Sequence, residues 1–190
     1  MLVFILGLLL FFIPHFTPVL LPGVKSGVVA SIGAGRWKGA YALISLAGLI
    51  LIVFGWIQYR PIAPQVYDPP SWGRHATALL VWISFVLLSL PRSKPGRILV
   101  IVKHPMLIGV FYWSAGHLLA NGDLASILLF GAFLVFTITS RISERLKGDP
   151  NHQFVSYRSD IIALGAGTLL YAVFVLWAHT WLFGVSPLGL

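Results

Sequence analysis

The 190-residue chain contains no cysteine, and only 9% of its residues carry a charge. Without cysteine it has no disulfides, no thiolate metal sites, no thiolate-ligated haem and no cysteine nucleophile. Soluble domains have roughly one-quarter charged residues, whereas this chain is 58% hydrophobic with a mean hydropathy of +0.91. The composition predicts an integral membrane protein and leaves histidine as the leading candidate for metal chemistry.

Acidic residues are also scarce. The chain has five Asp and Glu residues and 13 Lys and Arg residues, which gives a formal net charge of +8. Such an excess would suit nucleic acid, but the basic residues lie between long apolar runs, where the positive-inside rule accounts for them. We therefore expect membrane lipid around the chain and no nucleic-acid partner. Motifs for a serine nucleophile elbow, a P-loop or a dinucleotide site are absent from the sequence.

Apolar windows near the roughly 20 residues that cross a bilayer recur along the chain. The first, MLVFILGLLLFFIPH, lacks the basic start and cleavage site of a signal peptide, so we expect a retained helix. The fold class predicted is all-α, a polytopic transmembrane helix bundle of about six spans in a single domain over 1–190. The expected spans are 2–21, 39–58, 75–91, 104–120, 124–140 and 161–183.

The connections between these spans differ in charge. Eleven of the 13 basic residues lie in the first, third and fifth connections. The positive-inside rule then places these connections in the cytoplasm and both termini outside.

Three connections have further local signals. The sequence NGD at 121–123 predicts a left-handed residue at a helix end, followed by Asp123 as the N-cap of the next helix. Four prolines in RPIAPQVYDPPSWGR, 60–74, predict an extended external loop that ends at an interfacial Trp72. PGVKSGVVASIGAGRWKG, which begins at Pro22, is rich in small residues and is expected on the membrane surface or as a re-entrant segment.

Histidines inside apolar segments are candidates for function, because an intramembrane ionisable group is costly unless it is paired. His15 and His117 fit this description best. His179, within WAHTW, is more typical of an interfacial aromatic belt. His152 lies in the expected cytoplasmic loop, where a solvated side chain is the ordinary outcome.

Two more histidines stand at the expected starts of spans, and both have an ordinary explanation beside a functional one. His75 begins the third span after WGR. His104 precedes Pro105, and proline in the first turn is normal helix initiation. The candidate cofactor-binding residues are therefore His15, His75, His104 and His117.

The spacing of His104 and His117 limits what they can do together. Thirteen residues on a helix correspond to a rise of about 20 Å and a rotation of roughly 220°, so the two cannot ligate one metal ion. Haem best fits a cysteine-free bundle with histidines on separate helices. Gly109 and Gly116 lie on nearly one face, where they could admit a neighbouring helix or make room for a porphyrin. Closed zinc sites fit less well, because no carboxylate lies within a span.

A basic pair follows the fifth span in SRISERLKGDPNHQFVSYRSD, 140–160. Arg141 and Arg145 lie one turn apart on a helix expected to continue into the cytoplasm. Such a surface normally faces phospholipid. The alternative is a site for the anionic part of a ligand, with Glu144 as its lone carboxylate.

PPSWGRHATALLV, followed by KHPMLIGVFYWSAGHLLANGDLASILLFGAF and preceded by PHFTPVLLPG, resembles the NnrU family of bacterial membrane proteins over nearly the whole chain. The resemblance implies a multi-pass protein of the bacterial inner, cytoplasmic membrane. It also implies a link to nitrite and nitric oxide reduction in denitrification.

The NnrU family is in turn similar to 15-cis-zeta-carotene isomerase, a membrane protein that binds b-type haem through histidines. By this resemblance the metal ligands here are His15 and His117, the cofactor is haem b, and a hydrophobic small molecule is a candidate substrate. Ser114 stands where the isomerase has a cysteine implicated in ligand switching. The resemblance therefore implies isomerase-like redox chemistry that does not use this ligand switch.

A second resemblance leads to a different function. KHPM..G followed by RISERL...Y is similar to the C-terminal pattern of integral membrane methyltransferases such as isoprenylcysteine carboxyl methyltransferase. It implies S-adenosylmethionine near His104, Gly109, Arg141, Glu144 and Tyr157, although Lys103 and Leu107 depart from that pattern. A non-enzymatic membrane assembly partner is the third alternative, and the apolar surface is compatible with a homo-oligomer.

Overall fold

The computed structural model describes residues 1–187, and helices make up most of this part of the chain. In these residues the β-structure consists of one isolated antiparallel bridge between Gln65 and Asp123. The all-α prediction is thus confirmed.

The elements are α1 Leu2–Leu20, α2 Pro22–Ile32, α3 Ala34–Tyr59, the 3-10 helix η1 Arg60–Ile62, α4 Gly73–Leu88, α5 Arg97–Val102, α6 Pro105–Ala120, α7 Leu124–Lys147, α8 Arg158–Val173, the π-helix η2 Phe174–Ala178 and α9 His179–Phe183.

Four helical stretches of the described chain are long and apolar enough to cross a membrane: Leu2–Leu20, Ala34–Ile62, Leu124–Lys147 and Arg158–Phe183. Two shorter apolar helices, Gly73–Leu88 and Pro105–Ala120, add to them. Each of the six expected spans falls on one of these six stretches. These apolar helices indicate a membrane protein.

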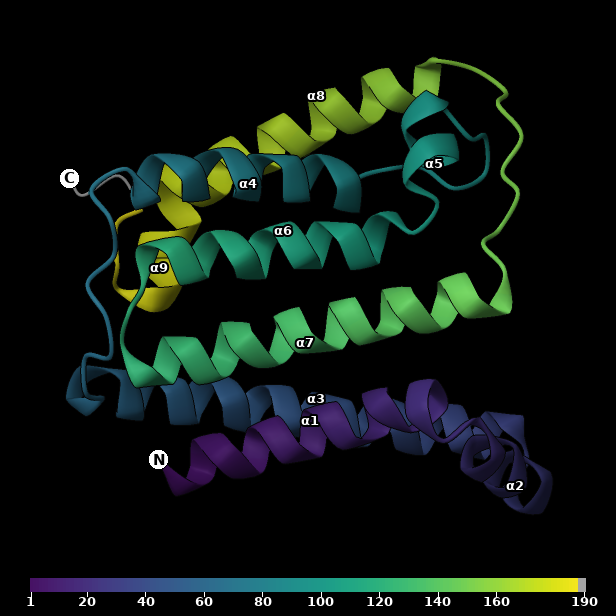
Figure 1. Cartoon of the computed structure of the whole chain (residues 1–190), viewed down its shortest axis with the longest axis horizontal. Helices are drawn as coiled ribbons and strands as arrows, with labels where there is room; N and C mark the ends of the chain where they lie inside the picture. The colour runs from purple at the N-terminus through teal and green to yellow at the C-terminus, as the bar shows by residue number, and fades with distance from the viewer. Residues whose placement is uncertain (188–190) are drawn as a thin grey trace. The chain divides into compact units, whose positions relative to one another are not determined.

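The chain divides into two compact units, of which the first comprises Met1–Val66 and Asp123–Ala132. Within it α1 packs along α3 (Figure 1). Glycines make the approach close, because a Cβ on Gly7 would stand 2.5 Å from the Ile52 nitrogen and one on Gly48 2.6 Å from the Phe11 nitrogen. The two backbones therefore pack against each other directly, as small residues allow in membrane helices.

Asp123 caps α7 as the sequence predicts. Its Oδ1 accepts a hydrogen bond from the Ser126 backbone nitrogen at 2.9 Å, and its Oδ2 accepts one from the Ser126 hydroxyl at 2.7 Å. Arg60 Nε adds an ion pair at 3.8 Å to Oδ2. The carboxylate thus satisfies donors at the N-terminus of α7.

The prediction of a left-handed residue in NGD is wrong. Asn121 is extended, with φ −134° and ψ 114°, and positive φ among residues 1–187 occurs only at Gly33, Lys103, Gly148 and Gly184. The Tyr67 hydroxyl supplies the reason, because it hydrogen-bonds the Leu118 carbonyl and lies 2.9 Å from the Asn121 carbonyl. The carbonyls at this end of α6 are satisfied without a left-handed cap.

The second unit comprises Tyr67–Gly122 and the chain from Phe133 onward. Here α4 packs against both α6 and α8 (Figure 1). A Cβ on Gly109 would stand 3.2 Å from Leu88 Cγ, and one on Gly116 3.2 Å from Leu80 Cβ. Of the two explanations for this glycine pair, the structure confirms close helix approach.

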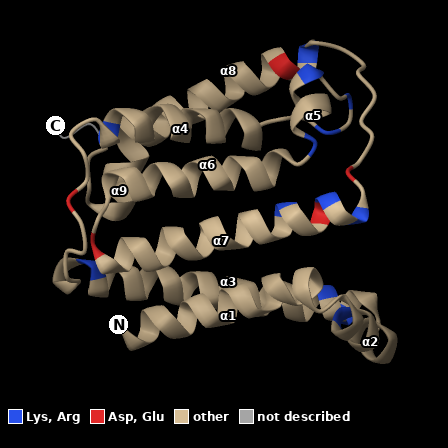
Figure 2. Cartoon of the chain, in the orientation of Figure 1, with Lys and Arg blue, Asp and Glu red and all other residues tan. Residues whose placement is uncertain are grey.

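One helix of the second unit was not expected from the sequence. The six-residue α5 lies in the third connection, and Asp160 at the start of α8 holds it. The Asp160 carboxylate accepts the backbone N–H groups of Arg97 at 2.7 Å and Ile98 at 3.1 Å. Lys and Arg residues gather at this end of the second unit, around α5 and the end of α7 (Figure 2).

The small-residue segment after α1 folds into α2, in which every residue is at least partly exposed. The first three residues of the predicted extended loop 60–74 form the 3-10 helix η1, Arg60–Ile62. The prediction of an extended loop is confirmed for the part that follows η1. Trp72, at the end of that loop, is 56% exposed.

Candidate functional site

His15 is presented by the proline-containing part of α1, with Pro14 and Pro18 inside the helix. Its Nδ1 lies 2.6 Å from the Phe11 carbonyl oxygen one turn earlier. The imidazole stacks on the Phe11 ring, with centroids 4.2 Å apart and planes at 20°. Tyr41 of α3 approaches the same imidazole, with ring centroids 5.1 Å apart.

His117 lies in the last turn of α6 and has the same local arrangement. Its Nδ1 is 2.8 Å from the Trp113 carbonyl oxygen, again one turn earlier. The Trp113 ring centroid lies 5.1 Å from that of the imidazole. The Asn121 amide donates to the His117 carbonyl at 2.9 Å and so fixes the backbone that carries the ring.

These contacts assign the tautomer of both imidazoles. A backbone carbonyl can only accept a hydrogen bond, so Nδ1 of His15 and of His117 must carry the hydrogen. The lone pair of each neutral ring then resides on Nε2. Metal-ligating histidines almost always donate their other ring N–H in this way, to a carboxylate, a backbone carbonyl or water.

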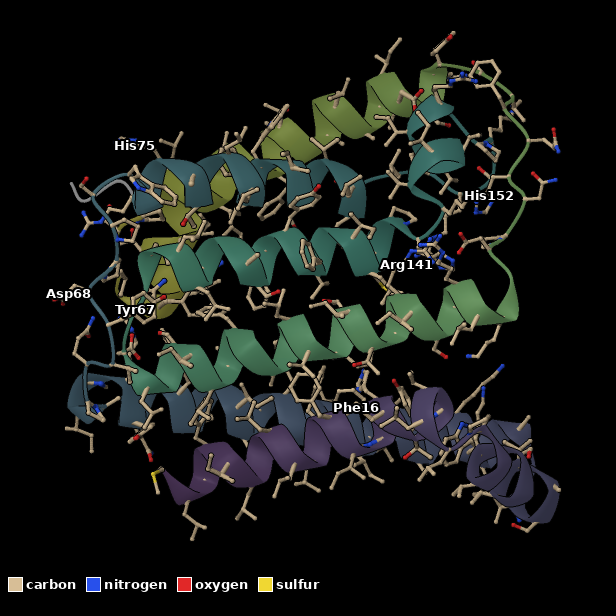
Figure 3. All side chains as sticks on the ribbon, in the orientation of Figure 1. Phe16, Tyr67, Asp68, His75, Arg141 and His152 are labelled. Atoms are coloured by element: carbon tan, nitrogen blue, oxygen red, sulfur yellow. The ribbon has the colours of Figure 1, made fainter. Side chains whose placement is uncertain are left out.

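The other candidate histidines lie at opposite ends of the second unit. His75, an exposed residue at the start of α4, lies at the same end as Tyr67, whereas Arg141 and His152 lie at the other (Figure 3). His104 is the N-cap of α6, directly before Pro105, and so takes the helix-initiating role expected for HP. Among the described residues no three His, Cys, Asp or Glu side chains form a group that could hold a metal ion by themselves.

His179 directly follows the π-helix η2. Its Nδ1 is 2.7 Å from the Val185 carbonyl oxygen. Phe174 and Phe183 surround the ring edge-on. His179 thus has aromatic neighbours, while its place at a membrane interface stays a prediction, and π-helical turns of this kind are frequent at functional sites.

The junction between α5 and α6 has an unusual backbone. Lys103 adopts φ 62° and ψ −46°, and the His104 nitrogen donates to the Val102 carbonyl at 2.7 Å. These values describe a γ-turn of the rare, strained type. A strained position of this kind costs about 1–3 kcal/mol and persists only where surrounding structure holds it.

A carboxylate organises the charged groups around this junction. Asp149 accepts two hydrogen bonds from Arg141, at 2.7 and 2.9 Å, and one from Lys103 at 3.3 Å. His104 Nε2 lies 3.3 Å from Asp149 Oδ1, outside hydrogen-bond geometry. The Arg141 guanidinium above all, and then Lys103, lower the pKa of Asp149 to about 2, against an opposing effect of burial.

A pocket of about 340 Å³ opens beside this network. Apolar groups of α5 and of the first turn of α6 form part of its wall, and polar groups from several segments form the rest. Ser140 is buried there, with 4% of its surface exposed. The lining residues are Arg92, Leu99, Lys103, His104, Pro105, Met106, Leu107, Ser140, Glu144 and His152.

The structure brings together only part of the residue set that the methyltransferase resemblance implies. His104 and Glu144 share the pocket, and Arg141 is connected to it through Asp149. Gly109 instead packs on α4, and Tyr157 is 62% exposed.

Sequence reasoning missed Asp149, Ser140 and the role of His152. The expectation that His152 is merely solvated is wrong, because its Nε2 lies 3.2 Å from the Lys103 carbonyl oxygen and its ring lines the pocket. The only signal for Asp149 was its place as the single acidic residue between Lys147 and His152, in KGDPNH. Only the fold shows which cations it meets.

These features define an all-helical membrane protein: its apolar helices are long enough to span a bilayer, glycines allow its helices to pack closely, and one end of its second unit is charged. A family model described as NnrU protein matches residues 3–187, and the chain belongs to the NnrU family. No curated protein and no solved structure shows significant similarity to it.

Proposed function

We propose that this NnrU-family protein binds haem b in the membrane through histidine ligands, with His15 and His117 as the ligand candidates. One observation carries the proposal: both imidazoles donate Nδ1–H to the carbonyl one turn earlier, so that Nε2 is the basic nitrogen. This hydrogen bond fixes ring orientation and raises ligand basicity.

The surroundings of each histidine fit this cofactor. Imidazole is a standard axial ligand of haem iron, and the chain offers no thiolate to compete with it. Aromatic rings adjoin each imidazole, Phe11 and Tyr41 in the first unit and Trp113 in the second. Haem would supply one-electron redox chemistry, which suits a role in nitrite and nitric oxide metabolism.

The topology proposed with this function has six spans, with both termini outside the cytoplasm. Eleven of 13 basic residues in alternate connections support it. The family membership supports a place in the bacterial inner membrane. Isomerase-like redox chemistry on a hydrophobic small molecule is the enzymatic form of the same proposal.

An absorption spectrum of protein purified after expression with adequate haem tests this function. Wild type is expected to show a Soret band at one haem per chain, and His15→Ala and His117→Ala are each expected to weaken haem retention by about tenfold or more. His152→Ala is the matched control and should retain wild-type haem content. A Soret band of full height in both His15→Ala and His117→Ala would contradict the ligand assignment.

A membrane methyltransferase is the second candidate, favoured by the pocket that His104 and Glu144 share. Titration of the purified protein with S-adenosylmethionine distinguishes the two functions. Saturable binding of that cofactor by haem-free protein, with no haem retention, would favour the methyltransferase. A protein that retains neither would support a non-enzymatic assembly role.

A further inference from the structure

The pocket beside the Lys103 turn lies at the N-terminus of α6. Pro105, Met106 and Leu107, the first three residues of this 16-residue helix, line it, and no side chain caps the helix. The first backbone N–H groups of a helix have no partner within the helix, and together with the helix dipole they favour an anion.

Ser140 gives an independent indication of a ligand. It is 4% exposed and lines the pocket, and its hydroxyl has no hydrogen-bond partner anywhere in residues 1–187. Two other helical serines, Ser26 and Ser114, bond back to their own helix, whereas Ser45 of α3 also has a buried hydroxyl without a partner in the described chain. A buried hydroxyl left without a partner is uncommon in native proteins and calls for an explanation such as a bound group.

Cations at the pocket outnumber the carboxylates that neutralise them. Glu144, the one acidic residue of the lining, is 3.0 Å from Lys147. Asp149 is shared between Arg141 and Lys103. Arg92, also in the lining, adds a further positive charge.

We propose that this pocket binds a phosphate-bearing anion, either free phosphate or the headgroup of an anionic phospholipid. The Ser140 hydroxyl and the backbone N–H groups of Met106 and Leu107 donate to phosphate oxygens, since Pro105 at the first position has no N–H, and Lys103 and Arg92 neutralise the charge. Leu99 and Met106 also line the pocket, and their apolar side chains would contact the organic part of a lipid. This proposal does not depend on haem binding.

The full-length protein in detergent is titrated calorimetrically with inorganic phosphate, and separately incubated with phosphatidylglycerol or phosphatidylcholine for detection of retained lipid by native mass spectrometry. Ser140→Ala removes one hydrogen bond to a charged group and is expected to weaken binding about tenfold. Lys103→Gly, which suits the positive φ, is expected to act in the same direction. Lys25→Gln, on α2, is the matched control and should bind as wild type does.

Saturable phosphate binding that both pocket variants weaken supports the proposal with a soluble ligand. Retention of phosphatidylglycerol over phosphatidylcholine with the same variant pattern supports it with a lipid. Equal binding by wild type and Ser140→Ala overturns it, provided that both unfold at the same temperature without ligand. Equal loss in Lys25→Gln, or binding of S-adenosylmethionine without phosphate or phosphatidylglycerol, also overturns it.

Discussion

Arg141 and Asp149 form a two-point ion pair, with Nη1–Oδ1 at 2.7 Å and Nη2–Oδ2 at 2.9 Å. Paired contacts of this kind are stronger and more directional than single ones. The pair connects the end of α7 to the segment that follows it, and Lys103 extends it to the start of α6.

Replacement of Asp149 by Asn is therefore expected to lower the Tm by a few degrees, because Arg141 and Lys103 lose their shared carboxylate. Thermal unfolding in detergent measures the change. Asp68→Asn, at an exposed loop position, removes the same charge elsewhere and should leave the Tm unaltered. Equal shifts in the two variants would mean that net charge, not the ion pair, is responsible.

The contribution of Asp149 should also depend on pH in a defined direction. Its pKa is lowered from 3.8 to about 2 in the folded chain, so the ionised carboxylate stabilises the fold above pH 4 and this stabilisation is lost as pH falls toward 2. The Tm difference between wild type and Asp149→Asn is expected to stay constant from neutral pH to about pH 5 and to shrink below pH 4. A difference that disappears near pH 6 would contradict this assignment.

Gly48→Ala is expected to destabilise the α1–α3 contact. Its new methyl group would stand 2.6 Å from the Phe11 nitrogen, and overpacking of this kind costs about 1–3 kcal/mol. Gly39→Ala on the same helix is the control, because a Cβ there has no atom of the described chain within 4 Å. Denaturation in detergent should show a loss of stability for Gly48→Ala alone.

The absence of cysteine makes topology measurable without background. Single cysteines at Asn151 and Asp68 would report on the fifth and second connections. In intact spheroplasts a membrane-impermeant maleimide should label Asp68→Cys and leave Asn151→Cys unlabelled until the membrane is opened. Labelling of both in intact spheroplasts would contradict six spans with the termini outside.

Short-range chemistry was readable from the sequence. The helix N-cap at Asp123 and the start of α6 at Pro105 depend on neighbouring residues, and the structure confirms both. The continuation of the fifth span past Arg141 is also confirmed, because α7 runs to Lys147.

Contacts between distant residues were not readable. Asp160 holds the first turn of α5 from 63 residues away, and Tyr67 satisfies the end of α6 in place of a left-handed cap. The pocket joins Ser140 to Arg92 and Lys103, which no local pattern connects. The ligand roles of His15, His75, His104 and His117 stay predictions.

Titration of haemin into purified haem-free protein in detergent tests the central claim most directly. We expect the Soret band to shift and saturate at one haem per chain, and saturation of His117→Ala to need a haemin concentration about tenfold higher or more. A linear, non-saturating change that equals haemin in detergent alone would contradict haem binding by this protein.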